Sequence, residues 1–461
     1  MLLLATVACQ RTEGTLGMHW SVDPSEAVTG KFVDVELEAP GTVVLTCTSR
    51  DDPRDVHVVR SETARENHST GVFGLLSSST YDCVLEADAD AGLWARGEFR
   101  TSTGRLPRGL EEGFVEGDTA AMTGAWTLFN PFENGKATDD QWLVVIDPEG
   151  EVRWYTEVEN QLGSVDASVI DGDILYGGGY DDPGSPRIVT LGHEVLYRGD
   201  QPLTGGTYHH DVEMTPSGLV AGLITREGDG YLGFGVEIRD PDDDGALVWA
   251  WESDDSVSDG DLPAPRGDLY HANALEIVEE DGVPRWAYIN VRNLGRYIRV
   301  DIEESVIDWQ ITSSVWSMTG DWWFLSHEPK LEGDRLLVYD NGERQPSAHS
   351  RIVEYELDFE NETGELIWEW TEDAWREPAW GGVDRLEGGN VLVAIGHCEG
   401  ASCDEVHPES RSRILEVDPD TDEVVWAYRY TDEDVGLYRA ERIDGCDLFA
   451  NARFCPQLLE D

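Results

Sequence analysis

The chain has 461 residues, 40% of them hydrophobic and 9% aromatic, which is enough for about two or three domains and excludes a disordered composition. Its 93 Asp and Glu residues outnumber 33 Lys and Arg residues, which gives a formal net charge of −60. A surface this acidic repels nucleic acid and anionic lipid headgroups, so proteins that bind through basic patches are excluded as a class.

The N-terminus is an apolar run, Met1 to Ala8, followed by Cys9. The other six cysteines fall into three local pairs, Cys47 with Cys83, Cys398 with Cys403 and Cys446 with Cys455. The run resembles the end of a bacterial lipoprotein signal, whose cysteine becomes the lipidated first residue; the alternative is an ordinary apolar start with a free thiol. We expect residues 1–16 to be a signal remnant and linker. The protein would then be extracytoplasmic and attached to a bacterial membrane only through a lipid on Cys9, where three disulfides are permitted.

Residues 17–103 contain short apolar runs that alternate with polar residues, such as Phe32 to Leu37 and Thr42 to Cys47. Period-two alternation broken by Gly, Pro, Asp and Ser is typical of antiparallel strands. Cys47 and Cys83 each lie within such a run, which predicts a disulfide between the two sheets of an immunoglobulin- or fibronectin-like β-sandwich. We expect a spacer or docking domain here, because the region carries no motif for chemistry.

Beyond residue 120 the sequence repeats one unit, an acidic turn followed by an apolar strand that ends in an aromatic residue. The six copies end at Trp154, Tyr197, Trp249, Trp309, Trp368 and Trp426. A second turn and strand lie between copies, for example at Ser217 to Ala221. Two hairpins in each period of roughly 40 to 60 residues indicate the four-stranded blades of a β-propeller. We therefore predict an all-β fold in which residues 120–461 form six blades, with the strand around Leu437 to Ile443 closing the ring.

Four histidines stand where a propeller could gather them. His210, His271 and His327 each precede an apolar strand of their own blade in equivalent phase, which would place them around one mouth of the ring. His397 has a different phase, because it follows the strand Val391 to Gly396 and precedes the Cys398–Cys403 loop. A single histidine at a strand start is more often a hydrogen-bonded structural residue. Four in matching context favour a shared site.

The segments around these histidines resemble the bacterial arylsulfate sulfotransferase (arylsulfotransferase) family over roughly residues 120–443. Five motifs in order carry the resemblance: His210-Asp211 at a strand start, His271-x-Asn273, the strand bearing Arg292, His327 before Asp340-Asn341-Gly342, and Ser350-Arg351 before Glu354-Tyr355-x-x-Asp358. An ordered set of this kind is more specific than one short match.

The resemblance implies a six-bladed enzyme that moves a sulfuryl group from a small aryl sulfate to a phenol, without a nucleotide sulfate donor and through a sulfohistidine. It implies a catalytic set of His210, His327, His397 and Arg351. The covalent histidine of the family lies late in the chain, and His397 is the candidate for it here. The residues that it implies for substrate binding are His209, His271, Asn273, Arg292, Asn341 and Arg439.

These residue types suit the reaction. A planar guanidinium such as that of Arg351 can hold two sulfate oxygens. A neutral imidazole can attack sulfur and later release it, and a second, protonated histidine can stabilise the leaving phenolate. We expect no required cofactor, and the chain has no Gly-x-x-x-x-Gly-Lys-Ser/Thr loop for a nucleotide.

Two other features have competing interpretations. Trp316, Trp322, Trp323 and Phe324 could wall a phenol pocket, although aromatic blade core is the commoner use. Asp240, Asp242 and Asp244 have the spacing of a calcium loop but lack a Glu at its twelfth position, so a solvated acidic turn is the default and a structural calcium ion the alternative.

The leading hypothesis is an arylsulfate-type sulfotransferase that takes small aryl sulfate donors and phenolic acceptors and no nucleic acid. A non-catalytic surface propeller that binds a sulfated aromatic ligand or a protein partner is the alternative. The sequence around Asp358 to Trp368 is also similar to blades of quinoprotein dehydrogenases, but those have eight blades with shorter periods.

Overall fold

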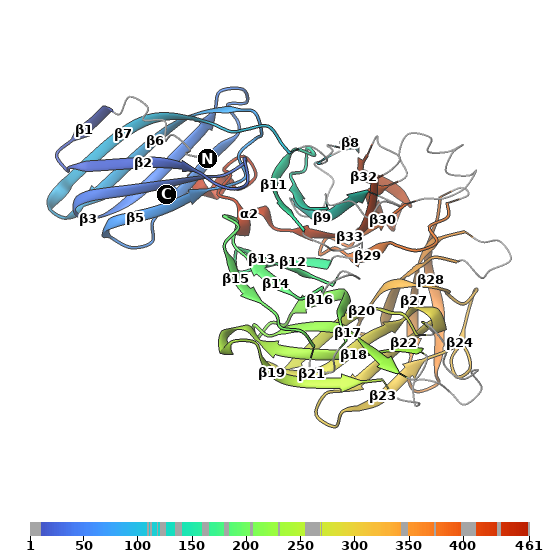
Figure 1. Cartoon of the computed structure of the whole chain (residues 1–461). Coiled ribbons are helices and arrows are strands. Elements are labelled where there is room, and N and C mark those ends of the chain that lie inside the picture. The colour runs from blue at the N-terminus through green and yellow to red at the C-terminus, as the bar shows by residue number, and fades with distance from the viewer. Residues whose placement is uncertain are drawn as a thin grey trace.

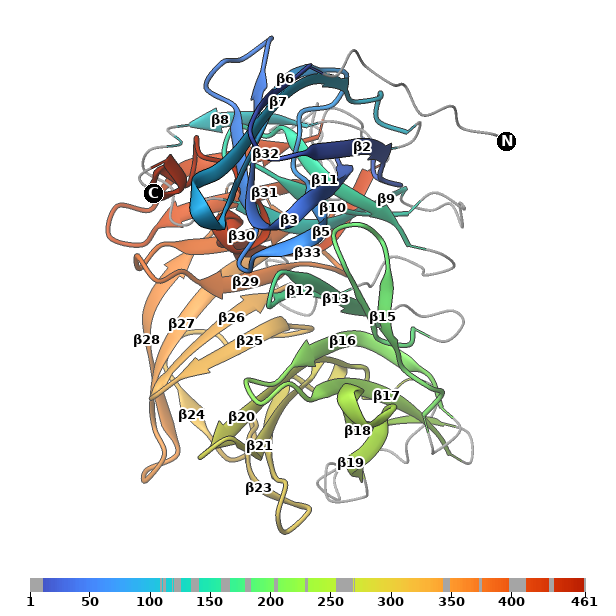
Figure 2. The ribbon, with the colours of Figure 1, turned by 90° about the vertical axis from the view of Figure 1, so that its left-hand side faces the viewer.

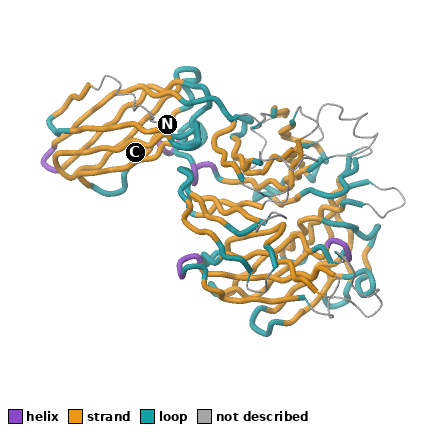
Figure 3. The backbone as a smooth tube through the Cα atoms, viewed as in Figure 1, coloured by secondary structure: helices purple, strands orange, loops and turns teal. Residues whose placement is uncertain are grey.

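The computed structural model describes residues 11–107, 110, 113–117, 119, 126–133, 141–158, 166–178, 184–202, 206–228, 231–253, 268, 270–342, 349–372, 375–397, 412–430 and 435–459. Nearly all regular structure in these residues is strand (Figure 3). Among them, no helix has the length and apolar character needed to cross a membrane. Cys9, Cys398 and Cys403 lie outside the described residues.

The N-terminal domain is one hydrogen-bonded network of seven strands centred on the long strand β3 (Lys31–Ser49). The first half of β3 pairs with β2 and β5, and its second half pairs with β4 and β6. The other strands are β1 (Arg11–Gly14), β2 (Met18–Pro24), β4 (Val56–Arg60), β5 (Arg65–Val72), β6 (Thr80–Ala89) and β7 (Leu93–Ser102), with a short 3-10 turn η1 (Asp90–Gly92). The predicted sandwich of two separate sheets is therefore not confirmed. The first paired strand also begins at Arg11, ahead of the expected boundary at residue 17.

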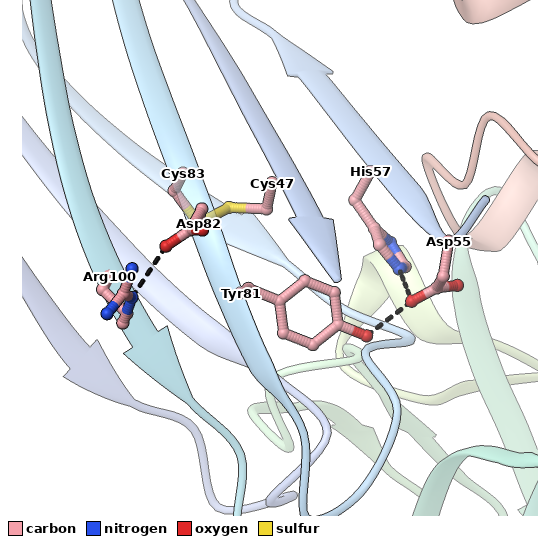
Figure 4. The surroundings of a disulfide bond; sticks show 7 residues. All are labelled: Cys47, Asp55, His57, Tyr81, Asp82, Cys83 and Arg100. Carbon is pink, nitrogen blue, oxygen red and sulfur yellow. Dashed lines mark hydrogen bonds and ion pairs between the residues drawn. A yellow bond between two sulfur atoms is a disulfide. The ribbon is translucent and has the colours of Figure 1, made fainter. Parts of the chain in front are cut away.

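The Cys47–Cys83 disulfide joins neighbouring strands of this sheet (Figure 4). Cys47 on β3 lies directly opposite Cys83 on β6, and their Cα atoms are 4.1 Å apart. The predicted bridge between two sheets is thus wrong, although the pairing is right. The alternating pattern shows which face of a strand a cysteine occupies, but it does not show which strand lies next to it.

The rest of the described chain forms a ring of six antiparallel sheets, here called blades 1 to 6 in chain order (Figures 1 and 2). Each blade is given from the channel outward. Blade 1 is β33 (Val435–Ile443), β9 (Trp126–Glu133), β10 (Trp142–Ile146) and β11 (Val152–Glu157). Blade 2 is β12 (Asp166–Ile170), β13 (Asp173–Gly177), β14 (Arg187–Val189) and β15 (Val195–Arg198). Blade 3 is β16 (Tyr208–Met214), β17 (Val220–Gly228), β18 (Tyr231–Asp240) and β19 (Ala246–Glu252), with the turn η2 (Pro241–Asp243).

Blades 4 to 6 follow the same plan. Blade 4 is β20 (Ala272–Glu280), β21 (Val283–Val291), β22 (Arg296–Asp301) and β23 (Val306–Ile311), with η4 (Arg292–Leu294). Blade 5 is β25 (His327–Glu332), β26 (Arg335–Asp340), β27 (Arg351–Asp358) and β28 (Thr363–Trp370), with β24 (Ser317–Met318) at its outer edge. Blade 6 is β29 (Gly382–Arg385), β30 (Val391–Ile395), β31 (Arg413–Asp418) and β32 (Glu423–Arg429), with β8 (Phe114–Gly117) at its outer edge.

The ring is closed by strands from both ends of the propeller. The C-terminal strand β33 pairs with β9 and becomes the innermost strand of blade 1, which confirms the predicted closure. At the other side of the seam, β8 pairs with β32 and extends blade 6. The propeller therefore uses chain from residue 114, ahead of the expected boundary at residue 120.

The repeated aromatic residue lies in the outermost four-strand position of every blade, and it joins that blade to the next. The indole N–H of Trp154 donates to Leu191 O of blade 2 at 2.9 Å, and that of Trp426 donates to Pro148 O of blade 1 at 3.0 Å. Trp249 and Trp368 make the same kind of bond to Ser305 and Asp422. A large apolar side chain with one hydrogen-bond donor suits this position, because it fills the space between two blades and donates to a turn of the adjacent blade.

The N-terminal domain and the C-terminal segment meet the propeller at a buried polar network around Asp55. The Asp55 carboxylate accepts hydrogen bonds from Tyr81 Oη at 2.5 Å, Arg153 Nη1 of β11 at 2.7 Å and Asn451 Nδ2 at 2.8 Å. His57 Nε2 lies 3.4 Å away (Figure 4). Arg153 also binds Asp147, so one fully buried arginine ties the two domains together.

The C-terminal segment completes this junction. It holds the helix α2 (Gly445–Leu448) and the turn η5 (Pro456–Leu459), which the Cys446–Cys455 disulfide links. The segment runs beside β4, where Val58 N–H donates to Ala450 O and Ala452 N–H donates to Val56 O. Figure 1 shows α2 next to the N-terminal domain.

Candidate functional site

The inner strands of four blades are bulged near the same mouth of the channel. Three residues, 209–211, stand opposite one residue of β17, and Asn273 is an extra residue between two pairs of β20. Residues 328–329 of β25 and 438–439 of β33 bulge in the same way. A bulge turns its side chains away from the regular alternation, which here lets consecutive polar residues face the mouth.

The backbone at this mouth is also strained. His210, His271 and Glu328 have positive φ angles of 62°, 48° and 41°. Residues other than glycine rarely adopt such angles, and they persist mainly where function or packing holds them. The equivalent phase of the histidines was visible in the sequence, whereas the bulges and the strain were not.

The structure brings His209, His210 and His271 together from blades 3 and 4. The His210 ring centroid lies 4.8 Å from that of His271 and 5.0 Å from that of His209, and the Nδ1 atoms of His209 and His210 are 2.7 Å apart. One of these two Nδ1 atoms therefore donates and the other accepts. The Nδ1 of His271 pairs with the Asp268 carboxylate. Tyr438 of blade 1 lies between this group and His327, with ring centroids 5.9 Å from His210 and 6.2 Å from His327.

Asn341 fixes the tautomer of His327. The Asn341 amide group donates from Nδ2 to Glu377 O at 2.8 Å and to Trp380 O at 2.9 Å, so its Oδ1 must face His327. Oδ1 can only accept, and therefore His327 Nδ1, 2.7 Å away, carries the hydrogen. The lone pair of His327 is thus on Nε2. Asn341, expected to bind substrate, acts in this structure as the partner that orients a histidine.

His397 is held by the same stretch of chain. Its backbone N–H donates to the buried Glu377 carboxylate, and its ring centroid lies 6.3 Å from that of Trp380. The preceding Gly396 allows a close approach to blade 1, because a Cβ there would lie 2.4 Å from Leu437 O. Residues 377–380 therefore position both His397 and, through Asn341, His327. Sequence reasoning missed this segment, because it lies in an irregular connection without a motif.

Burial lowers the pKa of His210 and of His327 well below the usual value for histidine. For His210 the neighbouring His209 and His271 add to the effect, and for His327 the charge of Arg292 adds to it. Both side chains are thus neutral imidazoles near neutral pH. Neutral histidines can attack sulfur or accept a proton, and the expectation that a second, protonated histidine stabilises the leaving phenolate stays a prediction.

We expect the protein to lose stability as the pH falls from about 6.5 to about 4, and His209 to account for part of the loss. Burial, with the charge of His271, lowers the pKa of His209 to about 4, whereas an unfolded histidine has a pKa of about 6.5. In this window the unfolded chain binds the proton and the folded one does not, so folding stability rises with pH by on the order of 3 kcal/mol. In urea titrations, His209→Asn should have a shallower pH dependence than the wild type. An unchanged slope would contradict a neutral, buried His209.

Arg351 is not part of this group. It begins β27, the third strand of blade 5, and its Nε, Nη1 and Nη2 atoms donate to Asp340, Glu369 and Asp321 O at 2.8, 2.6 and 2.7 Å. Three of the five N–H groups of this guanidinium are therefore used by contacts within its own blade. These contacts give Arg351 a structural role in blade 5, and the expectation that it clamps sulfate stays a prediction.

Arg439 and Asn273 tie inner strands together. Arg439 Nη1 lies 2.7 Å from Asp211 Oδ2 and 3.3 Å from Asp166, and Arg439 Nη2 donates to Asn273 O at 2.5 Å. The Asn273 side chain donates to Ser326 O, which joins blade 4 to blade 5. The structure thus gives both residues contacts between inner strands, and their expected role in substrate binding stays a prediction.

Arg292 and Arg439 are the cations whose charges lower the pKa of His327. Arg292 donates from Nη1 to Asn293 Oδ1 at 2.9 Å and from Nη2 to Pro378 O at 3.0 Å, both neutral oxygen atoms. After burial, the charge of Arg292 is the next largest cause of the lowered pKa of His327.

A cavity of about 250 Å³ lies next to this group along the channel. Its charged lining consists of Asp166, Asp211, Glu213, Glu328, Asp384 and Glu441 together with Lys330 and Arg439. Burial and the repulsion of neighbouring carboxylates raise the pKa of Asp166, Glu213 and Glu441 well above the usual range. The channel is therefore acidic directly beside a mouth lined with histidines.

The remaining candidates lie elsewhere. Trp323 is fully buried and stacks on Trp322 with centroids 4.4 Å apart, and Trp316 belongs to the same core between blades 4 and 5, so these side chains are core. The carboxylate of Asp240 accepts hydrogen bonds from the backbone N–H groups of Asp242 and Asp243 and so caps η2. In the described chain, no group of three or more His, Cys, Asp or Glu residues is arranged to hold a metal ion.

Comparison with known proteins gives one family. The model of the arylsulfotransferase (ASST) family matches residues 121–439. No curated protein matches the chain. Solved structures with a similar arrangement include a protein of unknown function from Bacteroides caccae, 12% identical, which covers 69% of this chain and 98% of its own with a TM-score of 0.45. The Cps50 (Swd1) β-propeller domain of Myceliophteria thermophila, 12% identical, covers 68% and 88% with a TM-score of 0.37. These low scores carry no argument about function.

Proposed function

Because the chain belongs to the arylsulfotransferase family, we propose that it transfers a sulfuryl group from an aryl sulfate to a phenol at the histidine-lined mouth of the propeller. The single observation that supports this site best is the convergence of His210, His271 and His327 from three blades. Arg292 and His397 both contact residues 377–380, which also bind Asn341, the partner of His327. Neutral imidazoles and a guanidinium beside an open channel are what transfer of an anionic group requires.

In the first half of the proposed reaction, a ring nitrogen of His397 attacks sulfur. The new N–S bond forms as the bond between sulfur and the aryl oxygen breaks, and the aryl oxygen leaves with the electron pair as a phenolate. Arg292 balances charge on the sulfate oxygens, because its positive charge acts on the neighbouring His327. The histidine is assigned from the family's pattern and from its place beside residues 377–380.

In the second half, the oxygen of the acceptor phenol attacks the same sulfur and the N–S bond breaks, which restores the imidazole. The phenol loses its proton to His327 Nε2, which has the lone pair because Asn341 holds the proton on Nδ1. The low pKa of His327 keeps this base neutral before each cycle. That proton then goes to the phenolate released in the first half, so no net proton is consumed.

We place the aryl ring of the substrate against Trp380. This side chain is partly exposed, lies beside His397 and meets Phe132 edge to face with centroids 5.0 Å apart. Trp380→Ala should raise KM for 4-nitrophenyl sulfate about tenfold with a smaller effect on kcat, because the lost contact is the same in ground and transition states. Trp94→Ala, at an exposed Trp of the N-terminal domain, is the control. An unchanged KM in Trp380→Ala would remove Trp380 from the substrate site.

The test of the function is an assay with 4-nitrophenyl sulfate as donor. Purified protein should release nitrophenolate, and added phenol should accelerate the release as it accepts the sulfuryl group. If folded protein releases no nitrophenolate in the presence of phenol at any pH from 5 to 9, the proposed sulfotransferase activity is contradicted. If sulfate esters then bind without turnover, the chain is the ligand-binding propeller that the sequence left as the alternative.

We also propose that the protein acts outside the cytoplasm, anchored through Cys9. The disulfides Cys47–Cys83 and Cys446–Cys455 support export, because such bonds seldom persist in a reducing cytosol. A labelled fatty acid should be incorporated into the wild type and not into Cys9→Ala. Equal labelling of Cys9→Ala would contradict the lipid anchor on Cys9.

A further inference from the structure

An open pocket of about 690 Å³ lies at the outer rim of the propeller, between blades 4 and 5. Its lining comes from β23, from residues 315–316 before β24 and from the turn between β27 and β28, together with Trp251 of blade 3. Sites that take small organic molecules usually have volumes of about 300 to 1,000 Å³. His210, His271 and His327 lie at the innermost strands of their blades, so this pocket is separate from the mouth.

The pocket exposes apolar side chains that a soluble protein usually buries. Val306, Val315 and Phe359 are 54%, 48% and 40% exposed, and all three line the pocket. A single exposed apolar residue needs no explanation, whereas several around one hollow are typical of a binding site. A ligand that covers these side chains removes apolar surface from water, which favours its binding.

Three aromatic rings meet at one corner of the pocket. The ring centroid of Phe359 lies 5.4 Å from that of Trp309 and 5.4 Å from that of Trp316. The planes of these ring pairs are inclined by 52° and 86°, so Phe359 stacks on neither indole. Inclined rings around a space are the arrangement that holds ammonium ions, because the face of each ring carries partial negative charge.

The charges around this corner favour a cation as the ligand. The guanidinium carbon of Arg299 lies 5.1 Å from the Trp309 centroid, and Arg299 also binds Asp308, so ring and carboxylate already hold one cation of the protein here. The exposed Glu362 is a second carboxylate of the lining, and no Lys or Arg is among its described residues. With a net charge of −60 on the whole chain, this surface attracts cations and repels anions such as aryl sulfates.

We propose that this pocket binds an organic cation, namely an ammonium ion that carries apolar groups, as in quaternary amines. The ammonium lies against the rings of Phe359 and Trp309, with Glu362 beside it. Its apolar groups cover Val306 and Val315. A hydrated inorganic ion would leave the apolar wall exposed, and a neutral apolar molecule would gain nothing from the carboxylate. The inference does not depend on sulfuryl transfer.

The test is calorimetric titration of the full-length protein with choline, whose quaternary ammonium is the probe, and with 3,3-dimethylbutan-1-ol, which has the same shape without the charge. A background of about 0.5 M NaCl screens unspecific attraction of the cation to the acidic surface. One saturable site is expected for choline, with an affinity about fivefold or more above that for the alcohol. Absence of a saturable choline site would overturn the proposal, and so would equal affinity for the two compounds.

Substitutions at Phe359 separate the aromatic ring from the apolar contact. Phe359→Leu keeps an apolar side chain without a ring face, so it should weaken choline binding about fivefold, as Phe359→Ala does, and leave binding of the alcohol nearly unchanged. Glu362→Gln should weaken the binding of choline alone. Phe114→Ala, at a phenylalanine that is 38% exposed on the outer edge of blade 6, should bind choline as the wild type does.

The variants are expected to fold, because Phe359 and Glu362 lie in an exposed turn, and circular dichroism checks this. Wild-type affinity for choline in both Phe359→Ala and Glu362→Gln would overturn the proposal, since choline would then bind elsewhere. A dimer in sedimentation that Phe359→Ala dissociates would overturn it as well, since a second copy of the chain would then cover the pocket.

Discussion

The His397→Ala variant is expected to lose acceptor-dependent sulfuryl transfer by about four orders of magnitude or more while it keeps its fold. Without the ring nitrogen, no covalent intermediate forms and the transfer must occur in one step. The fold should survive because the anchoring hydrogen bond to Glu377 uses the backbone N–H of residue 397, which alanine retains. Initial rates of nitrophenolate release with and without phenol measure the loss. The control is His19→Ala, at an exposed position on β2 of the N-terminal domain.

Other variants separate the roles around the mouth. His327→Ala should lose about 10² to 10⁴ in rate, which is the range for a general base. Arg351→Met should lower stability more than activity, because its partners are carboxylates of its own blade. An active His397→Ala would contradict the assignment of the nucleophile. The covalent role would then pass to His327, whose Nε2 has the lone pair.

Arg153→Met is expected to destabilise the protein by about 3 to 5 kcal/mol, because it leaves Asp55 and Asp147 buried without their cation. The side chains of all three residues are inaccessible to solvent. The guanidinium also donates to Gly74 O, so the N-terminal domain loses two anchors on the propeller at once. Urea denaturation monitored by Trp fluorescence and by circular dichroism should show the loss. Separate transitions for the two domains should also appear.

The matched control is Arg54→Met. Arg54 pairs with Asp52 at 2.8 Å, but this pair is on the surface, where water and salt screen it, so no measurable change is expected. A cycle with Asp55→Asn tests the assignment further. The loss in Arg153→Met should shrink when Asp55 is already neutral, since one of the unpaired charges is gone. Equal losses in Arg153→Met and Arg54→Met would contradict a buried charge junction.

Much of the fold could be predicted because the blades repeat a local pattern. An acidic turn and an outer-strand aromatic residue recur, and Trp154 and Trp426 show why, since each indole N–H binds the adjacent blade. The closing strand near Leu437 was predictable for the same reason. The pairing of Cys47 with Cys83 inside one sheet was not, because strand order depends on long-range register.

The site was only partly predictable. His210, His271 and His327 share a phase along their strands, so their convergence follows from the propeller. Which arginine faces the site does not follow from the sequence, because Arg351 and Arg292 both lie in motifs. Only the tertiary contacts show that carboxylates bind Arg351. Residues 377–380 carry no periodic signal. Their role depends on backbone carbonyls and on one buried carboxylate, which no sequence pattern encodes.

The most direct test of the account is to trap the covalent intermediate. Protein incubated with 4-nitrophenyl sulfate and no acceptor, then digested at alkaline pH, should carry one sulfuryl group on the peptide that contains His397, detected by mass spectrometry. Phenol added before digestion should remove the group. If nitrophenolate is released while no histidine of the mouth ever carries a sulfuryl group, the proposed two-step transfer at this site is contradicted.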